Sequence, residues 1–401
     1  MSLLAVEDAL NRILDGITPT ETEFAPVAMA GGRVLADPLA ATRTQPPWAT
    51  SAMDGYAVRG ADVVEATTLK LIGQSAAGHR FEGELKPGET VRIFTGAPMP
   101  PGADTVIIQE NVETNGNQIK VPATEPRRFV RPRGLDFAQG DELLKEGQTL
   151  TPTRIALAAA MGYAEVPVRK KPVFAVLSTG DELVLPGETT GPDQIVASNN
   201  FGVAAMLQAA GAASVDLGIA PDDPGAIAEK LRTAIDGGAD VLVTTGGASV
   251  GDHDYVQEVL GTLGVEIGFW KIAMRPGKPL MFGRRGPATF IGLPGNPVSA
   301  LVCTRIFLVP LARAFLGLDS KETYEDAILG ADVPENDRRQ DHLRATLGIE
   351  NGRLVATPFS RQDSSMLAAL GRADALVIRP PHAPAAQAGD VCRVLRMNLS
   401  T

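Results

Sequence analysis

The segment TTGGASVGDHDYV (244–256) has the composition of a site for a phosphate and a metal ion. It follows ADVLV, which is typical of a buried parallel strand, and Gly246 and Gly247 allow the backbone to turn tightly beside a ligand. A helix expected over about 254–263 would direct its free N–H groups at the same loop. Asp252 and the aspartate two residues later could hold a hard cation such as Mg²⁺ against a phosphate. The alternative is an ordinary glycine-rich turn with an aspartate helix cap.

Two further segments place polar residues directly after expected strands. STGDEL (178–183) supplies Asp181 and Glu182, which suit metal binding or water activation, or else cap a turn and face water. GLPGNPVSALV (292–302) is a strand, a Pro-Gly turn and a helix capped by Asn296, which makes an anion-binding helix start or a purely structural turn. Ligands of parallel sheets bind at the carboxyl ends of strands, so we expect the chemistry to gather at Thr179–Glu182, Thr244–Asp254 and Leu293–Asn296.

Three cations surround a Pro-Gly turn in KIAMRPGKPLMFG: Lys271, Arg275 and Lys278. On a rigid loop they could clamp a phosphate or another oxyanion, and a solvated charge run is the alternative. Asp54 in SAMDGYAV and Thr95 in FTGAPMPPGAD indicate, taken alone, only turn chemistry. The histidines lack metal-ligand spacing, and the sequence has no G-x-S-x-G elbow, Walker loop or Rossmann fingerprint, so hydrolase, P-loop and dehydrogenase functions are set aside.

The composition limits the kind of protein. A chain of 401 residues is too long for one simple core, and a net charge of −10 argues against nucleic acid or an anionic membrane as the main partner. Two cysteines are too few for a disulfide scaffold or a cysteine zinc site, and Cys303 reads as a small buried hydrophobe. The first residues do not read as a secretory signal, and no uncharged apolar run is long enough to span a membrane. We therefore expect a cytoplasmic protein.

The pattern of helices and strands predicts an α/β plus β fold with several domains. Alternating strands and helices predict a mostly parallel sheet with helices on both faces, in an α/β domain at 171–318. Short β runs rich in Gly and Pro predict an inserted β domain at 43–135 and a C-terminal β domain, barrel-like, at 319–401. Two helices, one ending at Gly16 and one from Thr151 to Gly162, predict a helical linker domain made of 1–42 plus 136–170.

Taken together, the motifs resemble the molybdopterin molybdenumtransferase family (the bacterial MoeA type and the C-terminal domain of gephyrin). The matching strings are SAMDGYAV, FTGAPMPPGAD, RPRGLDF, STGDEL, TTGGASVGDHDY, RPGKP and GLPGNPVSA. They stand in the family's order and cover nearly the whole chain. Several long strings in order are far more specific than one glycine loop.

The resemblance implies an elongated four-part protomer that inserts molybdate into adenylylated molybdopterin with Mg²⁺, releasing AMP and the molybdenum cofactor. It implies a homodimer in which the partner's inserted domain completes the site, and a possible contact with the molybdopterin adenylyltransferase. By motif, the catalytic positions are Asp54, Thr95, Glu182, Asp222, Asp252, Lys271, Arg275 and Lys278. We hypothesise that Asp222 and Asp252 hold the metal, and that Arg275 and Lys278 hold molybdate.

The same resemblance implies a larger set of residues that contact the substrate. The positions expected to bind the pterin nucleotide or an anion are Arg133, Asp136, Thr179, Gly180, Ser198, Asn199, Gly246, Gly247, Ser249, Pro294, Gly295, Asn296, Pro297, Ser299, Arg344 and Ser365.

The chain also departs from the family pattern. Arg275 stands where lysine is common, which keeps the charge but changes its geometry. Thr44 and Gln45 stand where the family often has an aspartate nearby, and Trp48 replaces a phenylalanine. These departures leave the reaction class intact and affect only details of the wall that the partner supplies. Two other functions stay open because they could use the same Gly-Gly-Asp loop of the α/β domain: adenylation of molybdopterin or pyrophosphatase action on a dinucleotide. A non-catalytic scaffold like gephyrin is a third possibility.

Overall fold

The computed structural model describes residues 3–247 and 255–399, and the chain divides into two compact units. One unit comprises Met1–Glu23 and Arg169–Thr401, and the other comprises Phe24–Val168.

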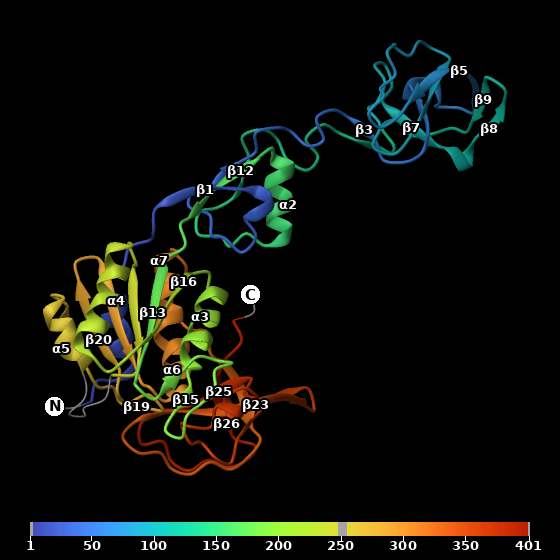
Figure 1. Ribbon diagram of the computed structural model, residues 1–401. Helices are drawn as coiled ribbons and strands as arrows, with labels where there is room; N and C mark the ends of the chain where they lie inside the picture. The colour runs from blue at the N-terminus through green and yellow to red at the C-terminus, as the bar shows by residue number, and fades with distance from the viewer. Residues whose placement is uncertain (1–2, 248–254, 400–401) are drawn as a thin grey trace. The chain divides into compact units, whose positions relative to one another are not determined.

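A six-stranded sheet forms the centre of the first unit (Figure 1). The first four strands are parallel and the last two are antiparallel to their neighbours, as the sequence predicted for a mostly parallel sheet. In spatial order the strands are β16 (Ala213–Ala220), β13 (Val173–Thr179), β17 (Val241–Thr245), β21 (Ala288–Leu293), β20 (Met281–Arg285) and β18 (Glu266–Phe269). Two short parallel strands, β14 (Leu183–Val184) and β15 (Ile195–Val196), follow β13 in the chain and form a separate two-stranded sheet.

Helices pack on both faces of this sheet because its strands are apolar on both sides. Phe174 and Val176 of β13 belong to one core cluster, and Ala175 and Leu177 belong to the other, as the two-residue period of a strand requires. The first face is covered by α1 (Val6–Leu14), α3 (Asn199–Ala209), α6 (Pro297–Cys303) and α7 (Val309–Phe315). The second face is covered by α4 (Pro224–Asp236) and α5 (Tyr255–Thr262).

The helix ends follow the residues that predicted them. Asp223 caps α4 by accepting a hydrogen bond from the Ala226 N–H, and Gly16, just after α1, has φ 67°. The predicted caps Ser198 and Asn296 do occupy the N-cap positions of α3 and α6, but neither side chain makes a cap bond within the described residues. The Asn296 side-chain amide instead donates a hydrogen bond to Ser364.

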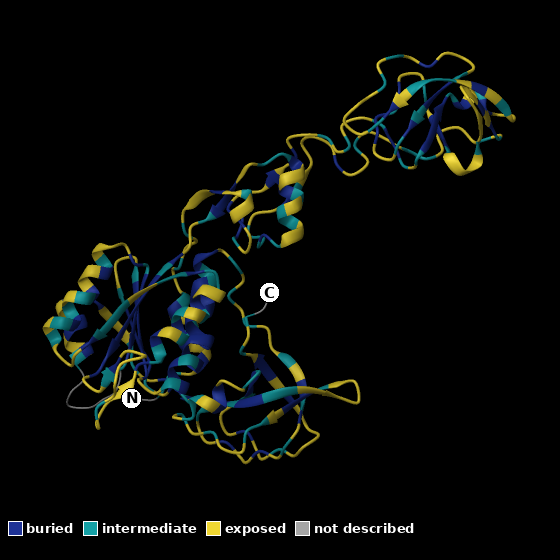
Figure 2. Ribbon diagram, turned by 45° about the vertical axis from the view of Figure 1, so that its right-hand side comes forward, coloured by how far each residue is buried: buried dark blue, intermediate teal, exposed yellow. Residues whose placement is uncertain are grey.

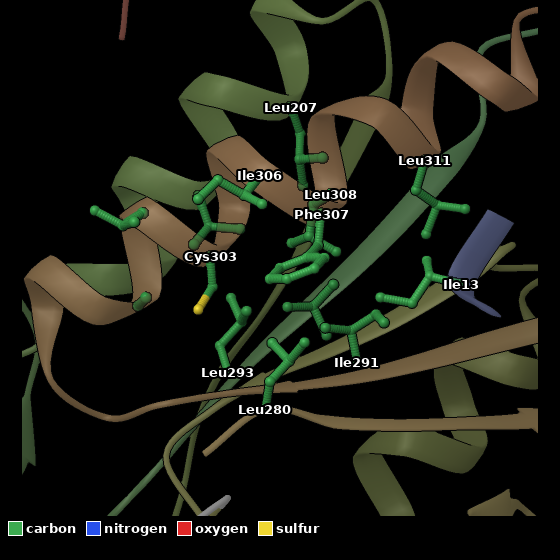
Figure 3. Packing of buried hydrophobic residues seen from close by; sticks show 14 of the residues in the cluster. Ile13, Leu207, Leu280, Ile291, Leu293, Cys303, Ile306, Phe307, Leu308 and Leu311 are labelled. Carbon is green, nitrogen blue, oxygen red and sulfur yellow. The ribbon is translucent and has the colours of Figure 1, made fainter. Parts of the chain in front are cut away.

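The helix after β21 runs from Pro297 to Phe315, with a π-helical turn at Thr304–Leu308 (η4) between α6 and α7. Its length and composition would suit a membrane span, but 83% of its 18-residue apolar stretch is buried inside the molecule, as in the core helix of a folded domain. Figure 3 shows Cys303 and Phe307 of this helix directed at Leu293 and Ile291 of the sheet. Cys303 is fully buried, as expected of a small hydrophobe.

The end of the first unit is a β-barrel. Five of its strands close into a ring because β23 pairs with both β24 and β25, and β19 extends the sheet beside β23. The strands are β19 (Met274–Arg275), β22 (Glu325–Leu329), β23 (Gln340–Glu350), β24 (Arg353–Pro358), β25 (Ala375–Arg379) and β26 (Val391–Arg396), and the short helix is α8 (Leu367–Leu370).

The second unit contains a helix and a second six-stranded sheet. Helix α2 (Pro152–Met161) begins at the Thr151 cap and ends at Gly162, with φ 104°, as predicted. The sheet order is β7 (Thr105–Ile108), β4 (Gly55–Val58), β6 (Glu89–Ile93), β5 (Thr67–Ser75), β9 (Gln118–Val121) and β8 (Glu113–Asn115). Figure 2 shows the buried strands within each part and the exposed loops around them.

The remaining elements of the second unit are short. Three strand pairs are β1 (Thr22–Pro26) with β12 (Glu165–Arg169), β2 (Leu39–Ala40) with β11 (Glu142–Leu144), and β3 (Thr50–Ser51) with β10 (Val130–Arg131). Three 3₁₀ turns are η1 (Val27–Met29), η2 (Gly60–Asp62) and η3 (Gln109–Asn111).

Candidate active site

The carboxyl ends of four parallel strands lie at one edge of the central sheet. Thr179 is level with Ala220, and the neighbouring registers join Ser178 to Thr245 and Thr245 to Leu293. The loops that leave these strands therefore begin side by side, so the described starts of the three predicted segments meet at one edge.

Thr179 and two glycines lie at this edge, where β13 and β17 end. Gly246 has φ 101°, and a Cβ there would lie 2.6 Å from the Thr179 carbonyl oxygen and 2.9 Å from its Oγ1. Gly247 has φ 63° and would collide with Val256 of α5. Only glycine fits these positions, because Thr179 and Val256 occupy the space that a side chain would need. The buried Thr179 Oγ1 has no hydrogen-bond partner among the described residues, and a bound ligand would supply one.

Acidic side chains lie at the other end of the same edge. Glu182 folds its carboxylate back over Gly180, whose φ is 147°. The Asp222 N–H donates to Asp181 Oδ1 over 3.1 Å, and both aspartates are exposed. Hard oxygen donors of this kind suit Mg²⁺. Within the described residues no group of three or more His, Cys, Asp or Glu could enclose a metal by itself. Ser249 and Asp252 lie outside the described residues.

The start of α6 is held by neighbours on both sides. The Asn199 amide donates to the Gly295 carbonyl over 2.7 Å, and a Cβ on Gly295 would lie only 3.6 Å from the Gly246 Cα. On the other side, the Asn296 amide donates to Ser364 Oγ over 3.0 Å, and the Val298 N–H donates to the Ser364 carbonyl over 3.3 Å. Asn296 therefore connects the helix to the barrel instead of capping it. Pro294, Pro297 and Ser299 belong to the same turn and helix start.

Arg344 and Ser365 meet beside that contact. Arg344 is fully buried, its Nε donates to Gln362 Oε1 over 3.0 Å, and its Nη1 donates to the Asp363 carbonyl over 2.7 Å. Burial lowers the pKa of Arg344. Its Nη2 finds no acceptor in the described part of the chain. Ser365 Oγ donates to Asp363 Oδ1 over 2.6 Å, and the Ser365 hydrogen bonds lower the pKa of Asp363.

Gln362 and Asp363 were missed in the sequence because they belong to no recognisable motif. Their role becomes visible only once the chain has folded, since it depends on Arg344, which lies 18 residues from Gln362. The pair of serines after Asp363 was the only local sign of a polar turn.

The basic loop packs against α6. The Ile272 N–H donates to the Lys278 carbonyl over 3.0 Å, which closes the loop. Gly277 has φ 108°, and a Cβ there would lie 2.5 Å from the Cys303 sulfur. Lys271 and Lys278 are exposed.

Arg275 has partners that the sequence did not reveal. Its guanidinium forms an ion pair with Asp341, donates to Asn336 over 3.3 Å and lies 3.7 Å from Asp337. Its role as an oxyanion ligand stays a prediction, and the ion pairs give it a structural role at the barrel.

Four of the predicted residues belong to the second unit. Asp54 Oδ1 accepts hydrogen bonds from the Thr95 N–H and hydroxyl over 2.7 and 2.8 Å, and these bonds lower the pKa of Asp54. Arg133 and Asp136 are exposed on the segment before Phe137.

Comparisons with known proteins agree along the whole chain. Residues 4–162 match the family model described as the MoeA N-terminal region (domain I and II), residues 175–314 match a probable molybdopterin binding domain, and residues 326–397 match the MoeA C-terminal region (domain IV).

Curated relatives and solved structures give the same result. A molybdopterin molybdenumtransferase from Haemophilus influenzae is 35% identical, over 99% of both chains, and one from Bacillus subtilis is 32% identical, over 98% of this chain and 94% of its own. A molybdopterin biosynthesis MoeA protein from Pyrococcus horikoshii has a TM-score of 0.86 at 30% identity, covering 99% of this chain and all of that one. A second structure of that protein has a TM-score of 0.81 at 27% identity, over 98% of this chain and all of that one.

Proposed function

Because the chain belongs to the molybdopterin molybdenumtransferase family, we infer that it is a transferase that inserts molybdenum into molybdopterin in molybdenum cofactor biosynthesis. We further propose that it acts on adenylylated molybdopterin and molybdate, and that it releases AMP. The observation that carries this proposal is the shared edge where the two glycines, the start of α6 and the loop of Ser364, next to Arg344, meet.

The nucleotide phosphates would bind where backbone N–H groups are available. We propose Gly247 and Ser299 for this role, because helix starts favour anions, whereas the Gly246 and Val298 N–H groups already donate to the Leu293 and Ser364 carbonyls. Thr179 Oγ1 and Asn199 would fix the orientation of the nucleotide. Gly180, Ser198, Ser299 and the Pro294–Pro297 turn complete this part of the proposed site.

Molybdate would bind against the cations near the basic loop. Arg344 offers Nη2 from a buried position, and Ser365 and Lys278 lie on the loops that flank α6. A cation removed from water binds an oxyanion more strongly, because the surrounding dielectric is lower. Lys271 and Arg275 stay proposed members of this cluster. Glu182 would accept the proton of an attacking water when the link to AMP is cleaved.

The acidic residues fit a magnesium ion. Mg²⁺ usually takes one or two protein carboxylates together with substrate phosphates and water, and Asp222 lies exposed beside Asp181. We propose that Asp222 and Asp252 would hold the ion. When bound, it would offset the negative charge of the phosphates.

The proposal extends to assembly and location. We propose a homodimer in which Asp54, Thr95, Arg133 and Asp136 come from the partner's inserted domain, because these residues carry family motifs yet belong to the second unit. We also propose a cytoplasmic location and a transient contact with the molybdopterin adenylyltransferase. The domains proposed from the sequence are 1–42 plus 136–170, 43–135, 171–318 and 319–401, except that Met1–Glu23 belongs to the first unit, where α1 packs on the central sheet.

The test is to incubate the pure chain with adenylylated molybdopterin and Mg²⁺, with and without molybdate, and to measure AMP. Insertion predicts AMP release that molybdate stimulates and that a chelator abolishes. AMP release at the same rate with and without molybdate would indicate a pyrophosphatase, and no AMP release at all would indicate a scaffold. Formation of the adenylylated substrate from ATP and molybdopterin would indicate an adenylyltransferase. Asp222→Asn at saturating Mg²⁺ tests the metal ligand, since unchanged AMP release would exclude it.

A further inference from the structure

A cavity of about 470 Å³ lies between the basic loop and the C-terminal barrel. β19 carries the basic loop into the barrel sheet by pairing with β23, with Arg275 opposite Asp341. The cavity opens beside this pair, and its size falls in the range of roughly 300–1,000 Å³ that is typical of small-molecule sites.

Two buried side chains in the cavity wall have unused hydrogen-bonding atoms. Asp341 is 3% exposed, and while it pairs with Arg275, its Oδ1 has no partner among the residues described. His342 is 2% exposed, and its Nδ1 is likewise without a partner in the described chain. Burial lowers the pKa of His342 to about 4, so the ring is neutral at physiological pH. Buried polar atoms of this kind are normally satisfied, which points to a ligand.

The charges of the wall disfavour an oxyanion. Arg275 is paired with Asp341, and Arg379 donates to the carbonyls of Pro334 and Pro384. Both cations are therefore already in use, whereas Asp332, Glu335 and Asp341 contribute three carboxylates. The wall also contains the half-buried Phe359 and several apolar side chains. A flat, neutral molecule rich in hydrogen-bond donors matches this lining.

We propose that this cavity binds the pterin end of the substrate, with Asp341 Oδ1 accepting from the 2-amino group of the aminopyrimidinone ring. This inference rests on the proposed function and names the site of one part of its substrate. Arg275 holds Asp341 Oδ2, so Oδ1 is the oxygen left to accept this donor. Phe359 supplies an aromatic surface for the ring.

The position of the cavity suits a substrate with two different ends. Pro276 lines it and is two residues from Lys278, and Gln362 lines it while bonding to Arg344. The cavity thus shares walls with the residues proposed for molybdate. A pterin bound in the cavity and a phosphate bound at the strand ends would lie on either side of the residues proposed for molybdate.

Binding of 6-hydroxymethylpterin to the full chain tests the proposal by calorimetry, with 6-hydroxymethyllumazine as the matched ligand. Lumazine has an oxygen in place of the 2-amino group, so we expect it to bind at least about tenfold more weakly, since hydrogen bonds to charged groups are the stronger kind. Asp341→Asn should abolish that preference. Asp337→Asn is the control, because Asp337 also faces Arg275 but does not line the cavity.

A second variant covers the case in which Asp341→Asn folds poorly. Ser360 is exposed and lines the cavity, so Ser360→Phe should obstruct it without disturbing the core and should weaken pterin binding about tenfold. Equal affinity for the two ligands, unchanged binding in Ser360→Phe, or a crystal soak with pterin bound elsewhere would overturn the proposal. Molybdate-stimulated AMP release measured on the same preparation separates this failure from a failure of the proposed function.

Discussion

Asn296 and Ser364 join the α/β domain to the barrel at the edge of the candidate site, by a hydrogen bond of 3.0 Å from the Asn296 amide to the Ser364 hydroxyl. Asn296 is the N-cap residue of α6, yet it directs its side chain at the barrel. The bond therefore links the helix start, proposed for phosphate, to the loop of Ser364 and Ser365, which lies next to Arg344 and is proposed for molybdate.

Breaking this bond should affect catalysis more than stability. We expect Asn296→Ala and Ser364→Ala each to lower kcat/KM for AMP release by about 2–12-fold, the range of one neutral hydrogen bond. The double variant should be no worse than the worse single variant, because both remove the same contact. Steady-state kinetics of the three variants measure this, and additive losses would show that the two residues act separately.

Gly246→Ala should destabilise the first unit through two separable effects. A left-handed conformation costs an alanine about 1–2 kcal/mol, and the new Cβ would also press on Thr179, which brings the expected loss to about 2–4 kcal/mol. Gly264→Ala is the control, because Gly264 has φ 70° but open space around it. Urea unfolding should show the larger loss for Gly246→Ala, and equal losses would refute the close contact.

The sequence predicted the elements of the site better than their connections. Local backbone geometry decides where glycines and prolines stand after a strand. The segments STGDEL and GLPGNPVSA could therefore be assigned to strand ends from their own residues. Contacts such as Arg344 with Gln362 or Arg275 with Asp341 join segments that only the folded barrel brings together. Asn296 shows the limit most clearly, since a good cap residue was used for a tertiary contact. The cavity beside β19 left no signal in the sequence at all.

Thr95→Val should raise the pKa of Asp54 towards its usual value of 3.8, because one of the two bonds that lower it is lost. A lowered pKa adds stability that is fully present above the unfolded value and is lost as pH falls through the folded value. The variant should therefore lose this contribution at a higher pH than the native chain. Carbon-13 NMR of the aspartate carboxyls measures the shift, with Thr114→Val as the control on an exposed strand of the same unit.

Arg305→Met should strongly destabilise the first unit. Arg305 and Glu322 form an ion pair with side chains only 5% exposed, and Arg305 Nε also donates to the Arg396 carbonyl over 2.9 Å. Removing one partner leaves a buried charge, which typically costs 3–5 kcal/mol, although Arg313 lies 3.8 Å from Glu322 and would offset part of it. Adding Glu322→Gln should restore some stability. The exposed pair Arg396–Glu325 is the control, where Arg396→Gln should cost under about 1 kcal/mol.

Lys278→Ala should change the response to molybdate and leave nucleotide binding intact. Lys278 is exposed at the end of the basic loop, whereas the proposed phosphate contacts come from Gly247 and α6. Loss of one charge-assisted contact should raise the molybdate concentration for half-maximal AMP release by about 10–100-fold. Lys171→Ala removes an equal charge from an exposed position before β13 and should change neither value. If Lys278→Ala instead weakened AMP binding with an unchanged molybdate response, the lysine would belong to the phosphate site, because binding energy lost from one substrate alone identifies the group it contacts.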